Sequence, residues 1–213
     1  TVQHSVFSED MSKIFFIAAS YDDVERYSMP AGFVGQGWQY PDIANGTLNS
    51  SYFSSPHGAV GGFFRWSSDG TKFFLSGSGS SSTGNKEWHR HAASTAWDMT
   101  SISTSVEEEH TFTEDVDNIQ FKPDGMKVYV MTNIGTDTIN QYSLGDAWSF
   151  SSVTSDSKSY SSLQSTATKD FFIRDDGLKL YTMGSATDKI FQHTLSTAWD
   201  ISTVYSGFIT NDT

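Results

Sequence analysis

The stretch "FKPDGMKVYVM", from Phe121 to Met131, has three close counterparts elsewhere in the chain. They read "FSEDMSKIFFI", "WSSDGTKFFLS" and "IRDDGLKLYTM", and each places a lysine three residues after a turn aspartate. The steps between successive aspartates are 59, 55 and 52 residues. Recurrence at such a period predicts a repeat architecture. The four pairs are Asp10 and Lys13, Asp69 and Lys72, Asp124 and Lys127, and Asp176 and Lys179.

Each repeat has the sequence features of four short strands. Large residues alternate before the aspartate, and a run rich in β-formers follows the lysine. Between them stands "DG" in three copies, a strong hairpin signal because glycine adopts positive φ at no steric cost. The first copy has Met11 there instead, so we expect a different or strained turn. A third strand and a final Ser/Thr-rich piece follow, the last piece opening on Trp38, Trp97, Trp148 and Trp199.

Four antiparallel strands in about 50 residues describe the blade of a β-propeller. The pattern "PDG-x-K-hYV", "hxQYxL", "STAWDIS" resembles the propeller repeats of lactonase-like and YVTN-type proteins. It also resembles tandem repeats of marine bacterial and bacteriophage proteins. We therefore expect an all-β propeller of about four blades, as one domain over 1–213. The predicted repeats are approximately 1–62, 63–117, 118–169 and 170–213. Because no strand is left over to close the ring, a fragment of a larger propeller, or a ring completed by another chain, stays an open alternative.

The composition excludes several classes of protein. A net charge of −12 opposes binding to nucleic acid or to an anionic membrane. The apolar runs are too short for a membrane span. With no cysteine, the chain has neither disulfides nor cysteine-ligated zinc. The chain begins at Thr1, which suggests a processed or partial polypeptide.

Features that recur in every repeat are expected to be architectural. The aspartates would cap their turns, and the lysines would shield the strand ends. The four tryptophans would fill the space between blades, although a sugar-stacking role for one or two is an alternative.

One position in the repeat is a candidate active site. Six residues before the turn aspartates stand His4, Phe63, Asn118 and Asp170, at the start of the innermost strands. In a propeller these positions ring one mouth of the central channel. The resemblance to propeller hydrolases implies that His4, Asn118 and Asp170 would serve catalysis, with calcium as a low-priority cofactor. Against this, the four positions differ, and no acid–base pair is marked.

Two other groups could bind a metal, and each has a simpler interpretation. His89 and His91 share a strand face, but His91 and His193 stand where other repeats have Tyr27 and Tyr142. We therefore expect them to replace tyrosine, with no third ligand nearby. The acidic segment from Val106 to Asn118 could hold a hard cation, but a solvated loop is the favoured interpretation. Its candidate ligands are Glu114, Asp115 and Asp117.

Departures from the repeat are where specific binding is expected, because binding residues concentrate in loops on a rigid scaffold. The segment from Ser76 to Trp88 is expected to be a flexible loop. The excursion from Met29 to Gly62 is rich in aromatics suited to a glycan or protein contact, namely Trp38, Tyr40, Tyr52 and Phe53.

From these features we predict a non-enzymatic structural or binding module on an exterior surface. The expected settings are a virion appendage (tail fibre or spike), a capsid-decorating protein of a phage, or a secreted adhesion protein. Its partners would be other structural proteins of an assembly or a surface glycan, and no cofactor is expected. The expected location is extracellular or on a virion surface. The alternative from another class is a lactonase-like hydrolase with an axial site.

Overall fold

The computed structural model describes residues 2–7, 13–18, 23–28, 47–54, 60–77, 86–132, 137–161, 168–184 and 189–210. Asp10, Met11, Trp38 and Tyr40 therefore lie outside the described residues. The chain divides into two compact units. The first comprises Thr1–Thr83 and Glu87–Glu109, and the second comprises Gly84–Lys86 and His110–Thr213.

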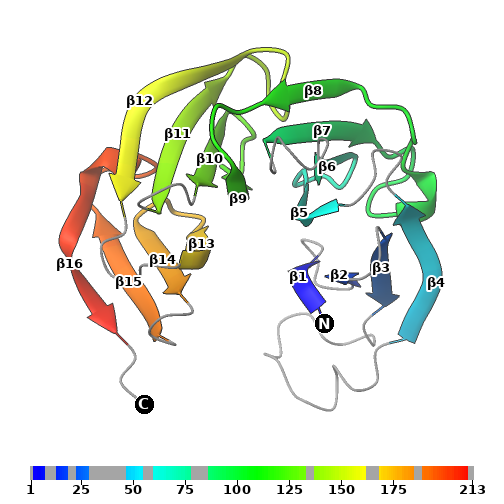
Figure 1. Ribbon diagram of the computed structural model, residues 1–213, viewed down its shortest axis with the longest axis horizontal. Helices are drawn as coiled ribbons and strands as arrows, with labels where there is room; N and C mark the ends of the chain where they lie inside the picture. Colours follow the sequence, from blue (N-terminus) through cyan, green and yellow to red (C-terminus); the bar gives the residue numbers. More distant parts are fainter. Residues whose placement is uncertain are drawn as a thin grey trace. The chain divides into compact units, whose positions relative to one another are not determined.

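The first unit contains two four-stranded antiparallel sheets, which we call blades 1 and 2 (Figure 1). Blade 1 is formed by β1 (Val2–Phe7), β2 (Lys13–Ala18), β3 (Asp23–Ser28) and β4 (Thr47–Ser54). Blade 2 is formed by β5 (Val60–Trp66), β6 (Lys72–Gly77), β7 (Glu87–Ala92) and β8 (Glu108–Thr111), whose last two residues belong to the second unit. A 3₁₀ turn, η1 (Met99–Ser101), precedes β8.

The second unit contains blades 3 and 4, built in the same way. Blade 3 is formed by β9 (Val116–Phe121), β10 (Lys127–Thr132), β11 (Thr138–Leu144) and β12 (Val153–Ser161). Blade 4 is formed by β13 (Thr168–Ile173), β14 (Lys179–Gly184), β15 (Lys189–Leu195) and β16 (Val204–Thr210), with η2 (Ile201–Thr203) before β16.

The predicted all-β class with four strands in each of four repeats is confirmed. Among the described residues there is no α-helix, and no helix is long and apolar enough to cross a membrane. The inner strands β5, β9 and β13 begin two or three residues before the predicted repeat boundaries at 63, 118 and 170. That 1–213 forms a single domain stays a prediction.

A clasp between glycine and tryptophan closes each described "DG" turn. In blade 3, Gly125 has φ 72°, its N–H donates to the Lys122 carbonyl, and its own carbonyl accepts from the Trp148 N–H at 2.9 Å. A Cβ placed on Gly125 would lie 2.3 Å from the Trp148 ring, so only glycine fits beneath the indole. Blades 2 and 4 repeat the arrangement with Gly70 under Trp97 and Gly177 under Trp199.

The turn aspartates in the described repeats cap the same turns. Oδ1 of Asp69, Asp124 and Asp176 accepts the backbone N–H two residues on, at 2.9–3.0 Å. The pKa of Asp124 lies below its usual value, because hydrogen bonds from Lys122 and the Met126 N–H outweigh the opposing effect of burial. These contacts stabilise the ionised carboxylate in the turn.

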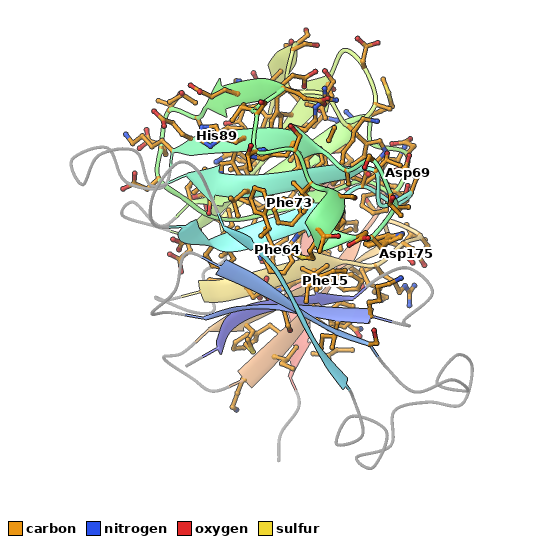
Figure 2. The ribbon with its side chains drawn as sticks, turned by 90° about the vertical axis from the view of Figure 1, so that its right-hand side faces the viewer. Phe15, Phe64, Asp69, Phe73, His89 and Asp175 are labelled. Carbon is orange, nitrogen blue, oxygen red and sulfur yellow. The ribbon has the colours of Figure 1, made fainter. Side chains whose placement is uncertain are left out.

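The core of the first unit lies between blades 1 and 2 and is mostly aromatic. Phe15 of β2 meets Trp66 of β5 at a ring-centroid distance of 5.5 Å. Phe64 and Phe73 are fully buried beside them, and Figure 2 shows the three phenylalanines gathered between the strands. The Trp97 ring also stacks on Phe15 at 6.3 Å, so this tryptophan contacts a neighbouring blade as well as its own glycine.

The core of the second unit joins blades 3 and 4. Tyr129, Met131 and Ile139 of blade 3 pack against an apolar group of blade 4. The Tyr129 hydroxyl donates to the Trp199 carbonyl at 2.6 Å. Burial, reinforced by nearby carboxylates, raises the pKa of Tyr129, so the phenol stays protonated as a donor. The blade 4 group comprises Phe171, Ile173, Leu180, Leu195 and Ile201.

Polar contacts fix the register of the same two blades. Asp156 of β12 accepts hydrogen bonds from Lys127, Gln141 and Ser143 at 2.6–2.7 Å. The Gln141 carbonyl oxygen in turn accepts the Ile201 N–H of blade 4 at 3.0 Å. A second link joins Lys158 Nζ of β12 to Asp200 Oδ2, at 2.5 Å. Gln141 therefore connects the charged cluster of blade 3 to the backbone of blade 4.

We predict that Gly177→Ala lowers the free energy of unfolding by about 2 to 4 kcal/mol, from positive-φ strain and displacement of the Trp199 ring. Chemical denaturation measures the change. The matched control is Gly207→Ala on the exposed strand β16, where the added methyl meets only the side chain of exposed Tyr205. Equal loss in the two variants would contradict the clasp.

We predict that Asp156→Asn lowers the free energy of unfolding at pH 7 by about 1 to 3 kcal/mol. Burial opposes ionisation of Asp156, but bonds from Lys127, Ser143 and Gln141 outweigh it and hold the pKa below the usual 3.8. The stabilisation is therefore present above the unfolded-state pKa and is lost as pH falls through the lower folded-state pKa.

Wild type should consequently lose more stability than Asp156→Asn between pH 7 and pH 3, as followed by denaturant titration at each pH. Asp146→Asn, at an exposed carboxylate in the same blade, serves as the control. Parallel pH profiles of stability for wild type and Asp156→Asn would refute the stabilising role of the ionised Asp156 carboxylate.

Candidate functional site

The structure brings two of the predicted channel-mouth residues together. Asn118 lies in β9 and Asp170 in β13, the innermost strands of blades 3 and 4. The Asn118 side-chain amide donates a hydrogen bond to Asp170 Oδ1. Asn118 is fully buried and Asp170 is half-buried, so the carboxylate lies at the edge of the packed strands.

Local backbone geometry sets the direction of these side chains. The β9–β10 register shifts between the partners of Asn118 and Val116, and the β13–β14 register shifts between Thr168 and Asp170. Such bulges redirect a side chain at a strand end and are common beside active sites. The same shift occurs in β1 between Val2 and His4.

The Asp170 carboxylate is held asymmetrically. Its Oδ1 accepts both the Asn118 amide and the Phe171 N–H, the latter at 2.8 Å. No donor among the described residues reaches Oδ2. One oxygen is therefore fixed by the protein, and the other can accept a proton or a hydrogen bond from a ligand.

A second carboxylate holds the start of β13. Asp137 Oδ2, in the segment before β11, accepts the Thr168 N–H at 2.5 Å, and both residues are buried. This link ties the two strand starts of blades 3 and 4 together, two residues from Asp170. The position of the Asp170 backbone is thus supported from two sides.

The other predicted site residues belong to the first unit, and several of them lie outside the described part of the chain. His4 lies in β1 of the first unit, and its side chain is outside the described part of the chain. Tyr52 lies in β4, and nothing is described of its side chain. Phe53 is only 4% exposed and packs edge-on against Phe73 at 5.5 Å, which is the placement of a core residue and not of a binding surface. The glycan or protein contact predicted for Trp38 and Tyr40 stays a prediction.

The two histidines of β7 lie among packed residues of the first unit. Both His89 and His91 are buried. His91 Nδ1 lies 2.9 Å from the Ser103 carbonyl oxygen, and its ring meets Phe53 at 5.3 Å. Within the described ranges no three His, Asp or Glu side chains come together as metal ligands, and this covers Glu114, Asp115 and Asp117.

Comparison with known proteins gives the fold and not a family. No protein-family model and no curated protein matches the sequence. Solved structures do match. A proposed 6-phosphogluconolactonase of Bacteroides fragilis aligns with a TM-score of 0.62 at 13% identity, over 99% of this chain and 55% of its own.

Two further structures agree with it. A proposed 6-phosphogluconolactonase of Bacteroides uniformis gives a TM-score of 0.61 at 13% identity, over 99% of this chain and 55% of its own. The periplasmic gluconolactonase of Pseudomonas aeruginosa gives 0.53 at 13% identity, over 98% and 56%. The likeness shows a β-propeller fold. This chain spans about half the length of the solved structures it matches.

These matches correct the functional prediction. We expected a non-enzymatic module, and the expectation is contradicted because these three matching structures are named lactonases. They also give no support to the virion, tail-fibre or adhesion settings, or to the phage resemblance. The alternative of a lactonase-like hydrolase is the better supported interpretation, although likeness at 13% identity shows the fold alone.

Proposed function

We propose that this chain carries part of a lactone-hydrolysing site in which Asp170 is the general base. One observation carries the proposal. The Asp170 carboxylate is oriented through Oδ1 by Asn118 and by the Phe171 N–H, and Oδ2 is left to act on a ligand. The likeness of the fold to proteins named lactonases supports the choice of reaction.

The chemistry needs one base and one water molecule. Asp170 Oδ2 takes a proton from the water as the water oxygen attacks the lactone carbonyl carbon. The tetrahedral intermediate collapses with cleavage of the ring carbon–oxygen bond, and the departing oxygen receives the proton. The product is an open-chain hydroxy acid. Asn118 acts as a positioning residue, because it touches Asp170 and fixes the direction of Oδ2.

Calcium takes six to eight oxygen ligands, commonly including several carboxylates. Among the described residues, no three His, Asp or Glu side chains come together as ligands. The reaction above therefore uses no step through a metal. An extracytoplasmic location is part of the proposal, supported by the match to a periplasmic gluconolactonase.

We predict that Asp170→Asn lowers kcat/KM for lactone hydrolysis by about a hundredfold or more, since the general base is lost. Proton release from gluconolactone and 6-phosphogluconolactone, measured above the spontaneous rate, tests this. Asp175→Asn is the matched control, because Asp175 is an exposed carboxylate of the same blade (Figure 2). Equal activity in all three proteins would overturn the role of Asp170.

A further inference from the structure

One sheet face of blade 3 is buried by the blade that follows it. Tyr129, Met131 and Ile139 on this face are 0%, 1% and 2% exposed. They pack against Phe171 and Leu180 of blade 4, among other apolar residues. Within the second unit, a blade therefore offers one face to its successor and the opposite face to its predecessor.

Blade 4 has the same successor face, and the described residues leave it uncovered. Tyr181 and Met183 stand one repeat after Tyr129 and Met131, yet Met183 is 45% exposed. Phe172 is 50% exposed and stacks on Tyr181 at a centroid distance of 6.3 Å. Ile209, across the same face of the sheet, is 67% exposed.

A shallow depression of about 170 Å³ lies over β13, β14 and β15 of this blade. Its lining is apolar apart from Asp170, Thr182 and the Tyr181 hydroxyl. A contiguous apolar face of this kind marks an interaction site in a soluble protein. Because its equivalent in blade 3 receives a propeller blade, the matching chemistry is another blade's predecessor face.

Blade 1 has the predecessor face that would fit. Val6 and Phe15 point to blade 2, where they join the aromatic core of the first unit. Side chains alternate along a strand, so Ser5, which is exposed, and Ile14, which is 8% exposed, take the opposite face. In the repeat these two positions correspond to Phe171 and Leu180, which meet blade 3.

We propose that a second copy of this chain covers the exposed face of blade 4 with its blade 1, and that the contact is reciprocal. The chain spans only about half the length of the propellers it matches, so two copies supply the length of one such ring. Two copies would give eight blades, within the range of known propellers, and a closed two-fold assembly.

The same contact completes the proposed site. Asn118 and Asp170 occupy one repeat position in successive blades and are hydrogen-bonded. His4 holds that position in blade 1, so the second copy's blade 1 brings its His4 beside Asp170. An imidazole next to the Asp170 carboxylate would add a second group that can donate or accept a proton. The proposed dimer contact does not depend on the proposed hydrolysis. Only the role of His4 rests on the proposed hydrolysis.

We predict that light scattering finds a dimer, twice the 23.5 kDa of one chain. Met183→Lys should weaken the dimer by about tenfold or more, because it places a charge in the apolar contact. Met126→Lys, at a methionine of similar exposure (40%) in the turn of blade 3, should leave it unchanged. A monomer, or equal effects of the two variants, would overturn the interface.

Thiol cross-linking separates a second copy from closure within one chain. The chain has no cysteine, so Ser5→Cys and Met183→Cys introduce the only thiols. Chains with one substitution each, when mixed and treated with a short bis-maleimide, should form a covalent dimer. A product formed only within a doubly substituted single chain would show that blade 1 of the same chain fills the face and would overturn the proposal.

We predict that mixing His4→Ala and Asp170→Asn chains, each less active than wild type, raises activity towards about a quarter of the wild-type value after random exchange, since each mixed dimer regains one intact site. Absence of restoration with an active wild type would refute the pairing of His4 with Asp170. An inactive wild type that still dimerises would refute the proposed hydrolysis and leave the interface standing.

Discussion

Blades 2, 3 and 4 each depend on a glycine that lies beneath an indole. Gly125 can take positive φ only because it has no side chain, and the Trp148 ring occupies the space where a Cβ would stand. Trp148 itself has φ 58°, an unusual conformation for so large a residue, and its N–H bonds to the glycine carbonyl. The contact joins the inner hairpin turn to the segment that enters the outermost strand. The innermost and the outermost strands of the sheet are thereby linked to one another.

Local signals explain why the fold could be predicted from the sequence. The "DG" turns, the lysine that opens the second strand and the contact of the glycine with its tryptophan are all formed within one repeat, so the pattern predicts four sheets correctly. The polar links between blades could not be predicted in this way. Gln141 meets Ile201, and Lys158 meets Asp200, across 60 and 42 residues of chain. Nothing in the local sequence pairs them, because only packing of finished blades brings them together.

The site could be predicted in part for the same reason. Asn118 and Asp170 share a repeat position, and adjacent blades place equivalent positions side by side. The sequence did not decide between a binding module and a hydrolase, because a carboxylate in a strand, such as that of Asp170, looks like any other acidic residue until its partners are known. For Phe53, the sequence suggested a binding role that its position in the structure does not support. Its aromatic-rich segment suggests a binding surface, but β4 directs this ring into the core beside Phe73 and His91.

The differences between blades 3 and 4 bear on what blade 4 contacts. In blade 3, Gln120 makes two hydrogen bonds to the backbone of Ile173, at 2.6 and 2.7 Å. Blade 4 has Phe172 at the position equivalent to Gln120, so the same pair of hydrogen bonds cannot form on its successor face. The position corresponding to Ile173 in blade 1 is Phe7. A face that offers phenylalanine in place of glutamine is suited to an apolar partner strand. Replacing a directional contact by apolar burial favours association between separate chains, since burial contributes free energy without requiring that each hydrogen bond be rebuilt.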